Sequence, residues 1–367
     1  MTTSLLFSLL LLPPALAPDQ PLRLADGARV VLVGDTLIER EQASGWWELA
    51  LTTRFPGAKI QVRNLGWSGD TVFGDARAGF GTPADGFKAL VEHTLALKPT
   101  LIVLGYGRNE SFAGPDGLPA FRKGLETLLD RLAPSKAPIV LLSPLRQGDM
   151  GRPLPEPTVQ NRNLRLYADI LRDVATKRGL RFVDLYDLFG DLGKAPRGVT
   201  ENGIHLTERG YRWSAPRLES ALGWDDRRLV LDLKPGASGV SVVAPQLPLG
   251  DRTVVVRGLP AGAFTLTVDG KPAATADAKA WAQGVVVASP EAEQVAKLRR
   301  AIIAKNELYF HRWRPQNVTY LFGFRKHEQG QNAREIPQFD PLVAARESEI
   351  ADLARPTAHL YGLKPAR

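Results

Sequence analysis

Short apolar runs alternate with amphipathic stretches between residues 29 and 224. The runs are rich in β-branched residues and fall at 29–33, 59–64, 100–104, 138–143 and 181–185. Stretches with helical periodicity lie at 43–54, 84–97, 117–132, 159–178 and 207–222. This alternation predicts an α/β domain with a parallel five-stranded sheet covered on both faces. Because right-handed crossovers place every strand-to-helix loop along one edge of the sheet, we expect a ligand site at that edge.

The pattern of apolar and polar residues changes after Trp224. Short alternating runs follow at 229–233, 240–243, 253–256, 264–268 and 285–288, with glycine and proline between them. The pair Asp269-Gly270 is a strong hairpin signal. The pattern predicts a small β-rich, sandwich-like module over residues 225–290.

The remaining residues predict helices. A strong helical pattern covers 291–312 and ends at Trp313-Arg314-Pro315, and 340–353 has the pattern of a last helix. The aromatic residues at and after the first helix end are too apolar for a free tail; they are Trp313, Tyr320, Phe322 and Phe324. We therefore expect residues 291–367 to form a helical C-terminal extension that docks on the main domain.

The N-terminus has the pattern of a secretory signal. Residues 4–12 are largely apolar, and the triplet Ala15-Leu16-Ala17 follows them. This pattern predicts a signal peptide at residues 1–17 and an exported protein, periplasmic or extracellular. The alternatives are an uncleaved anchor or a buried N-terminal strand. No apolar run reaches the ~18–20 residues that a transmembrane helix needs.

Composition narrows the chemistry. The chain has no cysteine, which excludes disulfides, thiolate nucleophiles and cysteine metal sites. None of its five histidines stands at a metal-binding spacing, so we expect neither a metal nor a cofactor. The net charge of +8 comes without a basic run interleaved with aromatics, so we expect no nucleic-acid partner. The sequence indicates no oligomeric state.

Four short blocks stand where predicted strands end or predicted helices begin. In chain order they are Gly34-Asp35-Thr36, Gly66-Trp67-Ser68-Gly69, Gly107-Arg108-Asn109 and Asn202-Gly203-Ile204-His205.

Each block carries a group that acyl transfer can use. A hydroxyl at Thr36 would stand beside a helix N-terminus, whose free N–H groups favour developing negative charge. Glycine at position 69 lets a backbone N–H approach an oxyanion, and the amide of Asn109 can donate to one. His205 supplies a base. Taken singly, the blocks also fit a helix cap, plain turns and a structural histidine. Ser68 is a rival hydroxyl, but it lacks the upstream glycine of a nucleophile elbow.

As an ordered set, the blocks resemble the SGNH (GDSL-type) hydrolase superfamily over residues 29–224, which we assign to a domain at 28–224. The resemblance implies a flavodoxin-like three-layer α/β/α fold and an esterase-like acyl hydrolase without metal or cofactor. It further implies that Thr36 stands where the family has its nucleophilic serine. Gly69 and Asn109 then complete the oxyanion hole, and Asn202 and His205 stand for the family's Asp-x-x-His.

Two of these positions depart from the family pattern. Thr36 is a secondary alcohol with a stiff χ1, and its extra methyl crowds the attack trajectory. Asn202 can accept a hydrogen bond from an imidazole but cannot stabilise imidazolium with a charge, unless Glu201 swings in as a substitute carboxylate.

Three hypotheses follow for function. The first is an exported acyl hydrolase that acts on a small-molecule or carbohydrate ester. The alternative is a catalytically degenerate SGNH-fold protein that binds glycan or ester ligands without turnover. A nucleotide binder is disfavoured because no glycine-rich phosphate motif follows the first strand. On the active edge, Arg108 fits either an anionic substrate group or a surface salt bridge.

Overall fold

The computed structural model describes residues 20–236, 239–328 and 330–366. The predicted signal peptide at residues 1–17 lies outside the described residues. Within the described ranges, no helix combines the length and apolar character needed to cross a membrane.

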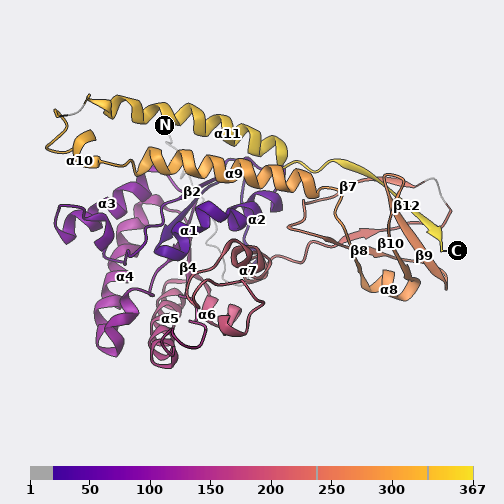
Figure 1. Ribbon diagram of the computed structural model, residues 1–367, viewed down its shortest axis with the longest axis horizontal. Coiled ribbons are helices and arrows are strands. Elements are labelled where there is room, and N and C mark those ends of the chain that lie inside the picture. The colour runs from indigo at the N-terminus through magenta and orange to yellow at the C-terminus, as the bar shows by residue number, and fades with distance from the viewer. Residues whose placement is uncertain (1–19, 237–238, 329, 367) are drawn as a thin grey trace, which may run out of the picture.

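A five-stranded parallel sheet forms the centre of the main domain (Figure 1). Its order is β2-β1-β3-β4-β5, and the strands span Gln61–Asn64, Arg29–Gly34, Leu101–Gly105, Ile139–Leu142 and Arg181–Val183. This is the flavodoxin-like order, so the predicted fold class is confirmed. Neighbouring strands β1 and β3 end at paired glycines, Gly34 and Gly105. A Cβ on Gly34 would lie 2.3 Å from the carbonyl oxygen of Gly105, so only glycine fits at this strand end.

Helices cover both faces of the sheet. They are α1 (Thr36–Ser44), α2 (Trp46–Arg54), α3 (Pro83–Ala96), α4 (Leu118–Leu132), α5 (Thr158–Arg178), α6 (Leu185–Phe189) and α7 (Glu208–Ala221). Alternate residues of β1 enter opposite cores: Val30 and Leu32 pack on the α2/α7 side, and Val31 and Val33 pack on the α3/α4 side. A strand buried on both faces explains why its sequence is a continuous apolar run rather than an alternating one.

The first helical segment differs from the single helix predicted at 43–54. Gly45 adopts φ 66° and divides the segment into α1 and α2. The left-handed conformation ends α1, and Gly45 then leads directly into α2. The practical result is that α1 begins at Thr36, immediately after the first strand.

The β-rich module contains two small sheets. Their orders are β10-β9-β12-β7 and β11-β8-β6. The strands span Leu229–Leu231 (β6), Val240–Val243 (β7), Arg252–Val256 (β8), Ala263–Val268 (β9), Lys271–Asp277 (β10), Val285–Val287 (β11) and Ala358–Pro365 (β12), with α8 at Ala278–Gln283. Asp269 and Gly270, at φ 50° and 79°, make the predicted hairpin between β9 and β10. The last strand, β12, lies within the stretch that the sequence analysis counted as helical extension.

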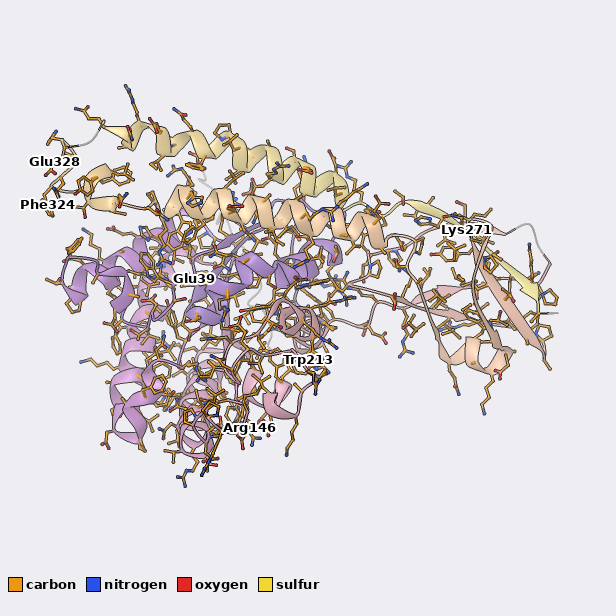
Figure 2. All side chains as sticks on the ribbon, in the orientation of Figure 1. Glu39, Arg146, Trp213, Lys271, Phe324 and Glu328 are labelled. Atoms are coloured by element: carbon orange, nitrogen blue, oxygen red, sulfur yellow. The ribbon has the colours of Figure 1, made fainter. Side chains whose placement is uncertain are left out.

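Two long helices lie along the main domain and lead into the β-rich module (Figure 1). They are α9 (Ala292–Trp313) and α11 (Phe339–Leu353), with the short α10 (Val318–Leu321) between them. Helix α9 packs on α1, α2 and β2. Trp313 reaches the main domain, where its ring lies 5.8 Å from that of Trp67. Phe324, in the connection between the two helices, is 82% exposed. This connection and Lys271 of the β-rich module lie at opposite ends of the molecule (Figure 2).

Candidate active site

Thr36 stands at the carboxyl edge of the sheet because α1 starts one residue after the turn that ends β1. The carboxylate of Asp35 caps this helix by accepting a hydrogen bond from the backbone N–H of Leu37 at 3.0 Å. Burial raises the pKa of Asp35 to about 6. Thr36 is thereby fixed as the half-buried first residue of the helix, while the N–H groups of Leu37, Ile38 and Glu39 all donate to Asp35.

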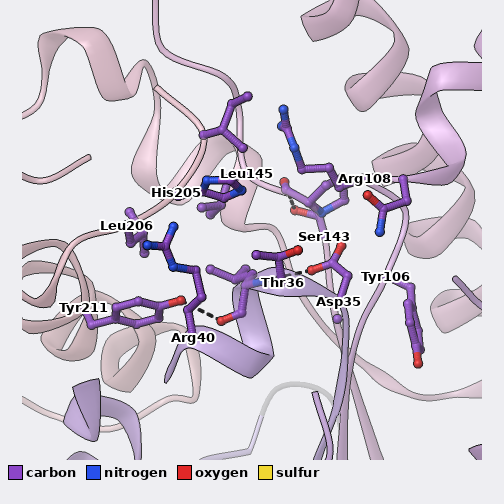
Figure 3. Close-up of a pocket in the computed structure, with 15 residues that line it drawn as sticks. Asp35, Thr36, Arg40, Tyr106, Arg108, Ser143, Leu145, His205, Leu206 and Tyr211 are labelled. Atoms are coloured by element: carbon purple, nitrogen blue, oxygen red, sulfur yellow. Dashed lines mark hydrogen bonds between the residues drawn. The ribbon is translucent and has the colours of Figure 1, made fainter. Parts of the chain in front are cut away.

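One pocket brings together three of the predicted site residues. Thr36, Asn109 and His205 all line it, and it measures ≈ 550 Å³ including its open mouth (Figure 3). The convergence follows from topology, because these residues lie after β1, after β3 and before α7.

Asn109 is held by the loop that contains Gly69. Its side-chain amide donates to the backbone carbonyl of Asp70 at 2.7 Å, which leaves the second N–H of the same amide for another acceptor. Glu110 accepts hydrogen bonds from the backbone N–H groups of Gly107 at 2.9 Å and Val72 at 2.8 Å, and so ties the two loops together. Burial raises the pKa of Glu110 to about 7.

Gly69 is placed differently from the other three. It is exposed, adopts φ 80°, and does not belong to the pocket lining among the described residues. Its neighbour Asp70 carries the contact to Asn109. Asp70 is itself buried and accepts from Arg77 at 2.7 Å and Tyr106 at 2.8 Å. Sequence analysis did not predict these hydrogen bonds of Asp70, because Arg77 and Tyr106 lie 7 and 36 residues away from it along the chain.

Asn202 faces the imidazole ring of His205 with its side-chain nitrogen and not with its oxygen. The Asn202 Oδ1 accepts hydrogen bonds from the backbone N–H groups of Ile204 at 3.1 Å and His205 at 3.0 Å. This orientation leaves Nδ2 at 3.3 Å from the His205 Nδ1. An amide nitrogen can only donate, so Nδ1 must accept, and the proton of the neutral imidazole resides on Nε2. In that tautomer His205 is a hydrogen-bond donor at Nε2.

The carboxylate considered as a substitute is engaged elsewhere. Glu201 accepts a hydrogen bond from the guanidinium of Arg40 at 2.6 Å. Burial, together with Arg40 and Arg108, lowers the pKa of His205 below its ordinary value. In the described part of the chain, no hydrogen bond joins the Thr36 hydroxyl to His205, as is common in unliganded sites.

The comparisons with known proteins agree with this geometry. The GDSL-like lipase/acylhydrolase family model matches residues 32–213, which contain Thr36, Asn109 and His205. Residues 32–213 form a GDSL-like domain. The assignment places the protein among hydrolases that act on ester bonds. Among curated proteins, none matches this sequence.

Solved structures extend the likeness beyond the GDSL-like domain. BT4096, described as a gut microbial diltiazem-metabolizing enzyme, has 14% identity and a TM-score of 0.67, with 95% of this chain and 100% of that chain covered. At this identity the match shows a shared fold, and it includes the β-rich and C-terminal parts. A catalytic mutant of Axe2, an acetylxylan esterase from Geobacillus stearothermophilus, has 18% identity and a TM-score of 0.45, covering 56% of this chain and 98% of its own. LAE5, an α/β hydrolase enzyme from the metagenome of Lake Arreo, has 23% identity and a TM-score of 0.43, covering 55% and 97%.

Other hydroxyls of the GDSL-like domain are less well placed than Thr36. Ser68 is exposed and lies outside the pocket lining. Ser143, which the sequence analysis did not consider, does line the pocket. Its Oγ accepts from the backbone N–H of Tyr186 at 3.0 Å and donates to Asp184 at 3.2 Å, so the hydroxyl already serves the turn after β4.

Among the residues described by the structure, no three histidine, aspartate or glutamate side chains gather as ligands for a metal ion. The pocket lining offers the carboxyl of Asp35, an imidazole, an amide, guanidinium groups, and the hydroxyls of Thr36, Ser143, Tyr106 and Tyr211.

Proposed function

We propose that this protein is an exported ester hydrolase that acts on small-molecule or carbohydrate esters, with Thr36 as nucleophile and His205 as base. The observation that carries the proposal is that Thr36, Asn109 and His205 line one pocket at the carboxyl edge of the sheet. Export is supported by the Ala15-Leu16-Ala17 pattern after an apolar stretch.

In this mechanism the Thr36 Oγ1 attacks the acyl carbonyl while its proton passes to the His205 Nε2. The second N–H of the Asn109 amide, with the backbone N–H of Thr36 at the start of α1, stabilises the oxyanion. His205 returns the proton to the leaving alcohol, and water then releases the acid from the acyl-threonine by the same two steps.

The tautomer of His205 limits this cycle. Before Nε2 can accept a proton, the ring proton must move to Nδ1, where it faces the Asn202 amide nitrogen at 3.3 Å. Two donors then oppose each other, which is unfavourable. We therefore infer a slow hydrolase.

The second candidate function is ligand binding without turnover. The tautomer of His205, with its proton on Nε2, favours this function. A histidine that donates at Nε2 is suited to hold an anion or a carbonyl oxygen rather than to deprotonate a hydroxyl. This candidate predicts ligand affinity that does not depend on the Thr36 hydroxyl.

Matched substitutions at Thr36 separate the two functions. Thr36→Val keeps the branched shape and removes the hydroxyl, and Thr36→Ser keeps the hydroxyl and removes the methyl group. With p-nitrophenyl acetate we expect no turnover above background for the valine variant. For the serine variant we expect a rise of about ten- to a hundredfold, because crowding at the attack trajectory is relieved. Ser68→Ala is the control and should hydrolyse at the parent rate. Equal rates for the parent and the valine variant would exclude Thr36 as nucleophile.

A further inference from the structure

One arginine in the pocket has no carboxylate partner. Arg108 precedes Asn109, and its Nη2 donates to the neutral amide oxygen of Gln147 at 3.1 Å. Its Nη1 is buried and has no hydrogen-bond partner. In the described part of the chain, no carboxylate forms an ion pair with this guanidinium. Asp35 acts on this charge without forming an ion pair with it, and burial lowers the pKa of Arg108, so the guanidinium has room for an anion at close range.

Several buried arginines elsewhere in the described chain pair with carboxylates, whereas Arg54 donates to the neutral amide of Gln246 and the backbone carbonyl of Asp225. Arg77 contacts Asp70 at 2.7 Å, and Arg252 contacts Glu291 at 2.9 Å. Arg227 forms a short ion pair with Glu219. These three arginines carry structural salt bridges, whereas Arg108 is one of the residues that line the candidate pocket.

The surroundings of Arg108 also favour negative charge. Arg40 and Arg108 flank Thr36 in the pocket (Figure 3). The donating Nε2 of His205 and the second N–H of Asn109 belong to the same lining. Among the described lining residues Asp35 is the one acid, and its Oδ1 already accepts from the first turn of α1.

We propose that the substrate carries a carboxylate close to its ester bond and that Arg108 binds this carboxylate. A guanidinium offers two parallel N–H donors that match a carboxylate, and a buried site strengthens the pair. Arg108 and Asn109 line the same pocket, so a carboxylate bound to Arg108 would share that pocket with the ester group. This inference rests on the proposed function for the ester, but not for the binding of the anion.

Matched substrate pairs test the proposal and locate the carboxylate. For the alcohol side, 4-acetoxybenzoate is compared with its neutral methyl ester. For the acyl side, mono-4-nitrophenyl glutarate is compared with 4-nitrophenyl pentanoate. We expect kcat/KM to favour the anion at least about tenfold in one pair, the effect of one charge-assisted contact. In Arg108→Gln this ratio should fall to near unity, and in Arg108→Lys it should be intermediate. Arg355→Gln, at an exposed remote site, should keep the parent ratio. A parent ratio near unity in both pairs, or a ratio unchanged by Arg108→Gln, would overturn the proposal.

Binding without turnover keeps this test separate from that of the proposed function. The amide 4-acetamidobenzoate and its methyl ester are titrated into parent and Arg108→Gln by calorimetry. Arg108-dependent binding of the anion with no hydrolysis of any ester would uphold the inference and refute the proposed function. Hydrolysis of the esters without a preference for the anion would uphold the proposed function and refute the inference. If Arg108→Gln does not fold, inhibition of the parent by benzoate but not by benzamide supports the inference, and equal inhibition overturns it.

Discussion

Asn202 presents an amide nitrogen to His205 at the position where a carboxylate would present an oxygen. The backbone N–H groups of Ile204 and His205 hold Oδ1, so the amide cannot turn over without losing two hydrogen bonds. One atom therefore selects the tautomer of the imidazole, which lines the pocket together with Thr36 and Asn109.

Asn202→Asp should restore the catalytic tautomer. One carboxylate oxygen keeps the two backbone hydrogen bonds, and the other accepts from Nδ1–H. The reverse change in a serine protease lowers kcat about 10⁴-fold, so we expect kcat to rise by about 10²- to 10⁴-fold here. The measurement is steady-state hydrolysis of p-nitrophenyl acetate. Glu92→Gln, which alters only the exposed pair with Lys88 on α3, is the control and should leave kcat unchanged. A lack of acceleration in Asn202→Asp would contradict the tautomer argument.

The pH dependence of kcat/KM tests His205 as the base. A base must be neutral, so activity is full above the pKa of His205 and is lost as pH falls through it. Burial and the two arginines lower this pKa, which places the acid limb below the ordinary histidine value of 6.5. In Asn202→Asp the new negative charge raises the pKa, so the limb should move to higher pH. Rates measured between about pH 4 and 8 show both effects. A limb that stays at the same pH in the two proteins would point to another group.

At the scale of elements, the break between α1 and α2 is held by a buried carboxylate. The Glu41 Oε1 accepts from the backbone N–H groups of Trp47 at 2.8 Å and Glu48 at 3.2 Å, and so caps α2. The other oxygen, Oε2, is buried without a partner. Burial, with the charge of Glu48 nearby, raises the pKa of Glu41 to about 8. Burial therefore favours the protonated carboxyl in the folded state, although the two capping N–H groups lower the pKa of Glu41.

Glu41→Gln should make stability less dependent on pH. In the parent the folded state binds a proton more tightly than the unfolded chain, whose glutamate has a pKa near 4.5. The resulting stabilisation is complete below that value and is lost as pH rises through about 8. Glutamine keeps the Oε1 cap and carries no charge, so the variant should be the more stable protein above that pH. Urea unfolding on both sides of the range measures this, with the exposed Glu92→Gln as control. A parent whose stability does not fall over this range would contradict the prediction.

At the scale of the whole molecule, α9 joins the GDSL-like domain to the β-rich module. Its Lys305 is buried and donates to Glu48 at 2.9 Å and to the backbone carbonyl of Val62 at 2.8 Å. Asn306 donates to the same carboxylate at 3.0 Å. This polar network fixes the position of α9 on α2 and β2. After α9 and α11, the chain returns to the β-rich module, where β12 lies between β7 and β9.

Lys305→Ala should destabilise the protein strongly, because it leaves the Glu48 carboxylate buried without its cation. Breaking a buried pair in this way costs about 3–5 kcal/mol in the free energy of unfolding. Lys297→Ala removes an exposed pair with Glu293 on the same helix and should cost about 0.5 kcal/mol or less. Chemical unfolding of both variants gives the comparison. Similar losses in the two variants would show that the Glu48–Lys305 pair does not hold α9 in place.

The sequence by itself determined the central sheet and the order of the site blocks. β-branched runs and helical periods are local signals, and the handedness of crossovers turns their order into one edge that holds Thr36, Asn109 and His205. The hairpin at Asp269-Gly270 was predictable for the same reason, because its turn needs two adjacent residues at positive φ.

Tertiary structure decided what depends on contacts between distant residues. Strand β12 forms because β7 and β9 pair with it on either side. The alternation of apolar and polar residues in its own sequence is too weak to predict a strand. Loop conformation places Gly69 outside the pocket lining and leaves Arg108 without an ion pair in the described chain. No periodic sequence pattern predicts the conformation of such loops. The tautomer of His205 depends on which way one amide faces, and backbone hydrogen bonds formed only in the folded loop set that direction.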